Sequence, residues 1–228
     1  SMVNLDNPPP GVTVVQKATT LSGNAIGTAE SIETPTGTAS DVSTAIELPA
    51  GTTFSDASGN QISGATLNTT VVHFNTKEAA SLNAFPGSGF HSDDITDEGG
   101  NKVSGIFRTA GFCNIDMSLS NTEVRTFSQP VTLRIGVSSD QVNPRTGAPF
   151  AAGDQIPVWS YQIETGKWSF EQQGTITNNS GKLEVAFETN HLRYYNLAFL
   201  DNLCAAATAT IITNLPAAET LLEHNFPE

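Results

Sequence analysis

The chain is short of charged residues and especially of basic ones. Only 14% of its 228 residues are charged, and ten Lys and Arg stand against 23 Asp and Glu, which gives a formal net charge of −13. Nucleic-acid binding requires basic side chains that neutralise phosphates, so this balance argues against that class. It argues equally against docking on an anionic membrane surface. No run of about 18 apolar residues occurs, so we expect no membrane insertion of this fragment.

Cysteine is also scarce, because the chain contains only Cys113 and Cys204. A disulfide between them would close a long loop and stabilise the fold by roughly 4 kcal/mol in the chain-entropy model. The alternative is two separate buried thiols, each behaving as a small hydrophobic side chain. Spacing alone does not decide between these alternatives. Neither cysteine lies in a CxxC pair, which argues against a zinc or redox motif.

The usual signatures of catalysis are missing as well. The sequence has no Gly-x-Ser-x-Gly elbow, no His-Glu-x-x-His, no P-loop and no Gly-x-Gly-x-x-Gly. The histidines stand outside any recognisable motif, at His73, His91, His191 and His224. We therefore predict that the chain is not an enzyme, that it has no catalytic residues, and that it needs no cofactor other than a candidate calcium ion.

What the sequence does contain is short runs of alternating apolar and polar residues, separated by Gly, Pro, Asn and Asp. This pattern is typical of β-strands joined by tight turns. The predicted strands are 13–16, 43–48, 70–74, 112–119, 131–137, 156–162, 167–172, 183–188 and 194–199. Many short strands at close spacing predict an all-β protein, an antiparallel β-sandwich or barrel. Short helices are expected only at residues 76–82 and 217–224.

The chain divides into three regions by composition. Residues 1–40 are rich in Pro, Thr, Ser and Gly and are expected to form a linker and N-terminal edge strands. Residues 41–200 hold the predicted strands, interrupted at 83–105 by a long polar insertion loop that looks too polar for a core. Residues 201–228 are expected to add a C-terminal strand or helix, or to begin a following module.

Three segments resemble ZU5-like domains. TAIELPAGT (44–52) is similar to the strand that opens such domains, FSQPVTLRI (127–135) to a later strand, and HLRYYN (191–196) to the closing strand, with Leu192 and Arg193 as departures. The stretch from PVWSY (157–161) to ETGKW (164–168) resembles a branch found in surface proteins and lipoproteins of Bacteroidetes-type bacteria. The ectodomain of cartilage intermediate layer protein is a more distant relative of that family.

This resemblance covers about residues 40–200 and implies a ZU5-like, Ig-like β-sandwich without catalytic residues. It implies a non-catalytic structural or adhesive binding module of a larger protein that is extracellular or anchored at the cell surface. The expected partner is a protein or a glycan at that surface. Two alternatives stay open: a surface glycan-binding module, and an accessory domain of a secreted hydrolase.

A calcium site is the best metal hypothesis, because calcium prefers oxygen ligands. Four acidic residues lie close together in the 83–105 insertion: Asp93, Asp94, Asp97 and Glu98. Their spacing does not match an EF-hand loop, and a solvated acidic loop is the alternative.

Aromatic residues supply the candidate ligand-binding site. Trp159 and Tyr161 alternate onto one face of a predicted strand, and the Gly166 turn brings Trp168 on the next strand beside them. Such rings either stack against sugars or build the core, and burial of both tryptophans would argue against a glycan platform. Tyr194 and Tyr195 should point to opposite faces of the last strand, which predicts that one of them is exposed.

Overall fold

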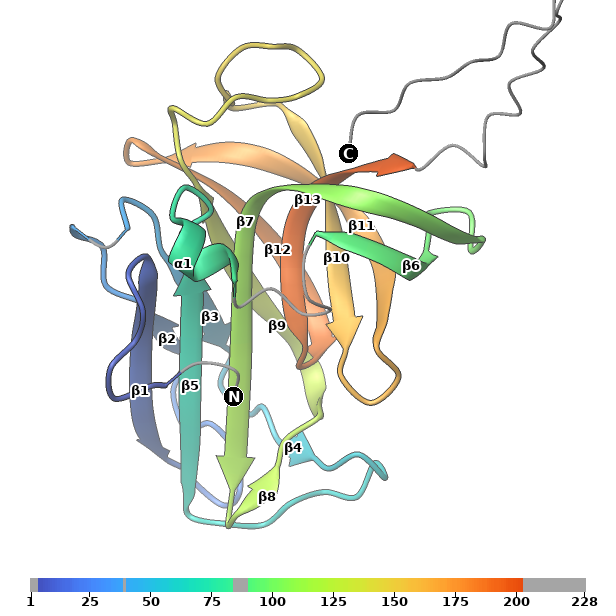
Figure 1. The fold of residues 1–228 in the computed structure, drawn as a ribbon. Coiled ribbons are helices and arrows are strands. Elements are labelled where there is room, and N and C mark those ends of the chain that lie inside the picture. Colours follow the sequence, from blue (N-terminus) through green and yellow to red (C-terminus); the bar gives the residue numbers. More distant parts are fainter. Residues whose placement is uncertain (1–3, 39, 84–89, 203–228) are drawn as a thin grey trace, which may run out of the picture.

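The computed structural model describes residues 4–38, 40–83 and 90–202, and these form an all-β protein with one short helix (Figure 1). The predicted antiparallel all-β class is confirmed. The elements are β1 (Val12–Thr20), β2 (Glu30–Glu33), β3 (Thr44–Leu48), β4 (Phe54–Ser55), β5 (Thr66–Phe74), α1 (Ala79–Leu82), β6 (His91–Thr96), β7 (Lys102–Leu119), β8 (Thr122–Glu123), β9 (Thr126–Val137), β10 (Gln155–Gln162), β11 (Lys167–Asn179), β12 (Lys182–His191) and β13 (Tyr194–Asn202). No helix in these ranges is long and apolar enough to cross a membrane.

Eight of the nine predicted strands lie inside an observed strand, and the ninth, 43–48, begins one residue before β3. The agreement is close because the alternation of side chains is a local signal. In β9, Val131, Leu133 and Ile135 are fully buried, whereas Arg134 between them is partly exposed. This two-residue period places one face of the strand against the core and leaves the other in solvent.

All thirteen strands belong to one sheet, whose main path runs β1-β5-β7-β13-β10-β11-β12-β9-β3-β2. The sheet folds back on itself, so that β3 and β9 lie behind β5 and β7 (Figure 1). The main core fills the space between these parts, where Ile46 and Leu133 belong to the same apolar cluster as Val71 and Ile115. The edges β1 and β2 meet through side chains, because Lys17 and Thr19 both contact the carboxylate of Glu30.

The N-terminal edge strands are part of this sheet. β1 pairs with β5 over all nine of its residues, and β2 pairs with β3. At the other end, β13 runs to Asn202, and the predictions for residues 203–228 lie outside the described residues. Of the two expected helices, the one at 76–82 is present as α1 and the one at 217–224 lies in that undescribed part.

The expectation of a purely polar loop at residues 83–105 is wrong for the described part of that segment. β6 pairs antiparallel with β7 and parallel with β11, while β7, β13, β10 and β11 are already neighbours in the sheet. These five strands therefore form a closed ring, seen beside the labels β6 and β11 in Figure 1. Ile95 of β6 is fully buried in a second apolar cluster inside it. One buried apolar residue in an otherwise polar strand is enough to close the ring.

Candidate functional site

The predicted aromatic platform is a buried core. Trp159 and Trp168 are 4% and 1% exposed, and both pack against Phe107 inside the ring, with ring centroids 5.3 and 5.0 Å away. The Trp159 Nε1–H donates to the carbonyl of Ala198 at 2.8 Å. The alternation correctly placed these rings on one face together with Tyr161, which is partly exposed. An exposed platform of Trp159, Tyr161 and Trp168 for sugar stacking is therefore not available.

Tyr194 and Tyr195 do lie on opposite faces, in the second and the main apolar cluster respectively. The expectation that one of them is exposed is wrong, since they are 3% and 0% exposed. The sheet is covered on both faces at β13. Successive side chains of this strand therefore point into the main core on one face and into the second apolar cluster on the other. Burial raises the pKa of Tyr194 to about 12, and the nearby Asp116 acts in the same direction.

The four candidate calcium ligands do not gather around one point. Asp93 pairs with His91, and Asp94 lies 3.2 Å from the Lys102 ammonium. The carboxylate of Asp97 instead accepts the backbone N–H of Asn101 at 2.8 Å. Within the ranges that the structure describes, no group of three or more His, Cys, Asp or Glu side chains could hold a metal ion. This arrangement does not test calcium binding at Asp93, Asp94, Asp97 and Glu98, but the contacts of Asp94 and Asp97 favour the alternative of a solvated acidic loop.

Cys113 is fully buried in the main core and forms no disulfide with any described residue. Burial raises the pKa of its thiol to about 12, so the thiol stays protonated at neutral pH. Its predicted partner Cys204 lies outside the described residues, and the pairing stays a prediction.

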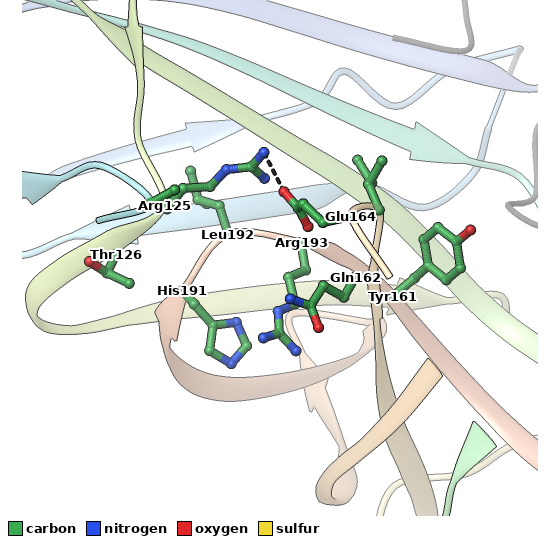
Figure 2. A pocket seen from close by; sticks show the side chains of 10 residues that line it. Arg125, Thr126, Tyr161, Gln162, Glu164, His191, Leu192 and Arg193 are labelled. Atoms are coloured by element: carbon green, nitrogen blue, oxygen red, sulfur yellow. Dashed lines mark ion pairs between the residues drawn. The ribbon is translucent and has the colours of Figure 1, made fainter. Parts of the chain in front are cut away.

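A hollow at one end of the sheet gathers polar side chains from four segments that are far apart in the sequence. It has a volume of about 270 Å³ and is lined from the turn after β4, the link between β8 and β9, the end of β10 with its turn, and the link between β12 and β13. Figure 2 shows Arg125, Glu164, His191 and Arg193 around it. We call it the Arg125 hollow.

Backbone hydrogen bonds tie these segments together. The N–H of Arg125 donates to the carbonyl of Ser55 at 2.8 Å, and the N–H of Leu192 donates to the carbonyl of Arg125 at 3.1 Å. The β10–β11 turn closes through a bond from Gly166 to Gln162, with Gly166 at a φ of 70°. Because these bonds fix the loops, the hollow is built into the fold.

Two arginines line the hollow, and each is paired with acidic side chains. The guanidinium of Arg125 contacts Glu164 directly (Figure 2) and lies 3.0 Å from the carboxylate of Glu123. Arg193 donates to the Ser160 hydroxyl at 3.1 Å and lies 3.7 Å from the carboxylate of Glu171. The site therefore contains both strong donors and strong acceptors.

Behind Arg193, the side chains of Glu171 and His191 continue the chain of polar contacts toward the buried Tyr195. The His191 Nε2 lies 3.5 Å from Glu171, and its Nδ1 lies 2.9 Å from the hydroxyl of Tyr195. Partial burial of Glu171 works to raise its pKa, but hydrogen bonding from His191 and Ser160 and the charge of Arg193 hold the pKa below its ordinary value. Burial raises the pKa of Tyr195, which keeps its hydroxyl neutral.

Sequence reasoning placed only Tyr161 of the hollow's lining among the ligand-binding residues. His191 lies at the end of β12, and neither it nor Arg125, Glu164 or Arg193 carries a motif. The placement of the basic residues gives no signal either: Arg193 lies inside the ZU5-like segment 191–196 and Arg125 just before 127–135, but Arg134 lies inside 127–135 as well.

No family model matches the chain, and no curated protein matches it. The resemblance to ZU5-like domains therefore stays an expectation from the sequence.

Proposed function

We propose that this chain is a non-catalytic binding module of a larger cell-surface protein and that the Arg125 hollow is its ligand site. The observation that carries the proposal is the convergence of four remote segments, locked by backbone hydrogen bonds, around a polar hollow of about 270 Å³. Ligand sites are typically concave and orient their ligand with a few fixed polar groups. The cell-surface setting rests on the resemblance of residues 40–200 to ZU5-like domains.

The contacts around the hollow support binding better than catalysis. Both ring nitrogens of His191 face partners within the protein, so neither is directed at a substrate. The Ser160 hydroxyl is fully buried, and it donates to Glu171, whose lowered pKa makes that carboxylate a weak base. A nucleophile needs both access and an effective base.

A second hollow offers a matched control. It has a volume of about 290 Å³ and lies on the outer face of β3, β9 and β12. In it Arg134 lies between Glu47 and Glu184, at 2.7 and 2.9 Å, much as Arg125 lies between Glu123 and Glu164. This Arg134 hollow sits on regular strands, whereas the Arg125 hollow is built from loop segments. We therefore expect ligand binding at the Arg125 hollow and not at the Arg134 hollow.

The test is an NMR titration of the full isotope-labelled chain with four small probes: methyl glucoside, acetate, tetramethylammonium and N-acetylalanine methylamide. We expect at least one probe to shift the backbone amides of Gln162, Glu164 and Arg193 while leaving that of Arg134 unchanged. Shifts of all four probes confined to other surfaces, or no shifts at all, would overturn the proposal.

A further inference from the structure

We infer that the Arg125 hollow binds a neutral saccharide unit. This inference rests on the proposed function and adds the chemical class of the ligand. It follows from three properties of the hollow, namely its balance of charge, its apolar side and its size.

The balance of charge favours a neutral ligand. The arginines Arg125 and Arg193 are offset by Glu123, Glu164 and Glu171, so the site has no positive excess to attract an anion. A cation finds no free carboxylate here, because Glu123 and Glu164 already contact Arg125 and Glu171 already lies beside Arg193. A chain with a net charge of −13 adds a general repulsion of anions.

Paired guanidinium and carboxylate groups match the hydroxyl group. Each sugar hydroxyl can donate one hydrogen bond and accept others, so it is satisfied by an acceptor and a donor placed side by side. Glu164 and Arg125 supply such a pair at the hollow, with Gln162 nearby to supply both kinds of group (Figure 2). Hydrogen bonds to charged groups are stronger than those between neutral groups.

An apolar side completes the match, because a sugar ring also presents C–H groups. Ile163 is 53% exposed at the tip of the β10–β11 turn and lines the hollow. The partly exposed Tyr161 also lines the hollow, but its ring packs on Trp168 and Tyr194 at centroid distances of 5.1 and 6.4 Å and points away from Arg125 and Glu164 in Figure 2. Ile163 is therefore the apolar side chain on which a sugar ring could pack.

The size of the hollow limits what it can hold. At about 270 Å³ it lies at the small end of ligand pockets, which suits one sugar unit more than a long segment of a chain. The Arg134 hollow has a similar volume and a similar ion-pair arrangement, but no aromatic or other large apolar side chain lines it. The Arg134 hollow therefore serves as the control: it has a similar ion-pair arrangement and volume, but it lacks a large apolar side chain on which a sugar could pack.

The experiment is a titration of the full chain, followed by NMR, with methyl β-glucoside, methyl β-galactoside, methyl α-mannoside and cellotriose. Galacturonic acid and acetate serve as the charged probes. We expect at least one neutral sugar to bind at the Arg125 hollow with a Kd of about 1 mM, and the charged probes to bind at least about tenfold more weakly. Arg125→Gln and Glu164→Gln should each weaken the sugar by about tenfold, the loss expected for a hydrogen bond to a charged group. Arg134→Gln should leave its Kd unchanged.

The outcomes separate this inference from the proposed function. If acetate or galacturonic acid binds at the hollow more tightly than every neutral sugar, the ligand class is wrong and the binding site stands. If a sugar binds but Arg134→Gln weakens it as much as Arg125→Gln, the hollow is not the sugar site. If none of these six probes shifts the amides of Gln162, Glu164 and Arg193, the saccharide inference is overturned. Thermal unfolding of each variant shows whether it is folded, and Glu164→Gln provides a second test if Arg125→Gln is not.

Discussion

The buried His73 on β5 should make the fold sensitive to mild acid. Its side chain is 1% exposed, and its Nδ1 lies 3.0 Å from the Thr44 hydroxyl. Burial lowers the pKa of His73 to about 4 from an ordinary value of 6.5, and the nearby Asp41 opposes this shift only in part. Cys113 is its neighbour across the strand pair, and burial keeps the thiol of Cys113 neutral as well. The folded protein therefore holds the His73 imidazole in its uncharged form.

The lowered pKa sets both the direction and the size of the effect. Below pH 6.5 the unfolded chain binds a proton on His73 that the folded chain accepts only near pH 4. The free energy of unfolding is therefore highest above pH 6.5 and falls as the pH drops toward 4. A difference of about 2.5 pKa units at about 1.4 kcal/mol each gives about 3.5 kcal/mol in full, of which about 3 kcal/mol is lost by pH 4, where half of the folded molecules are protonated. That is a large part of the total stability of an ordinary domain, which is about 5–15 kcal/mol.

The assay is urea unfolding of the wild type and of His73→Leu between pH 7.5 and 4. Carboxylates also titrate in this range, so the quantity of interest is the difference between the two pH profiles. We expect the wild type to lose about 3 kcal/mol more than the variant over this range. Parallel profiles for wild type and His73→Leu would refute the reasoning. If His73→Leu does not fold, the imidazole C–H resonances of wild-type His73 should show no titration above about pH 5.

Three further predictions concern the packing of the sheet, the buried thiol and the acidic residues. Gly174→Ala should destabilise the fold by about 1–3 kcal/mol in urea unfolding, because a Cβ there would lie 2.5 Å from Val185 Cγ1. Gly37→Ala is the control: its Cβ meets nothing within 4 Å, so the free energy of unfolding should hardly change. In a Cys204→Ser background, the thiol of Cys113 should react with a disulfide reagent only as fast as the protein opens, and fast labelling without urea would contradict its burial. Millimolar calcium should not raise the Tm in a way that a chelator reverses, since Asp94 already pairs with Lys102 and Asp97 already accepts hydrogen bonds from Asn101, and a reversible rise of several degrees would show that the acids regroup around the ion.

The sequence predicts the regular strands of this fold well, but it does not predict that β6 closes five of them into a ring. Strands such as β9 alternate β-branched or large apolar residues with polar ones, and this signal needs no knowledge of the partner strand. β6 contains Ser92, Asp93 and Asp94, which are poor strand formers, and it becomes a strand because β7 and β11 bind it on both sides. That reason is tertiary and is invisible in a local pattern.

The same distinction explains what was found and missed at the candidate site. Alternation correctly put Trp159, Tyr161 and Trp168 on one face, but their exposure depends on the ring that β6 closes over them. The Arg125 hollow depends on contacts such as the ion pair of Arg125 with Glu164, which joins two loops that no spacing rule relates. Sites built from several loops on a scaffold are therefore harder to predict than the strands that carry them.

The closed ring and the hollow share the β10–β11 hairpin, and this links the buried aromatic core to the proposed ligand site. Trp168 pairs with Ile95 of β6 in the ring and also packs against Tyr161, which lines the hollow. The turn of the same hairpin carries Glu164, the partner of Arg125. Loosening the ring of strands would therefore let the β10–β11 turn move. Arg125 and Glu164 would then move apart, and a sugar hydroxyl would lose its paired donor and acceptor although neither side chain is substituted. The burial of the tryptophans, which removes the sugar platform expected from the sequence, is thus also what holds the alternative site in shape.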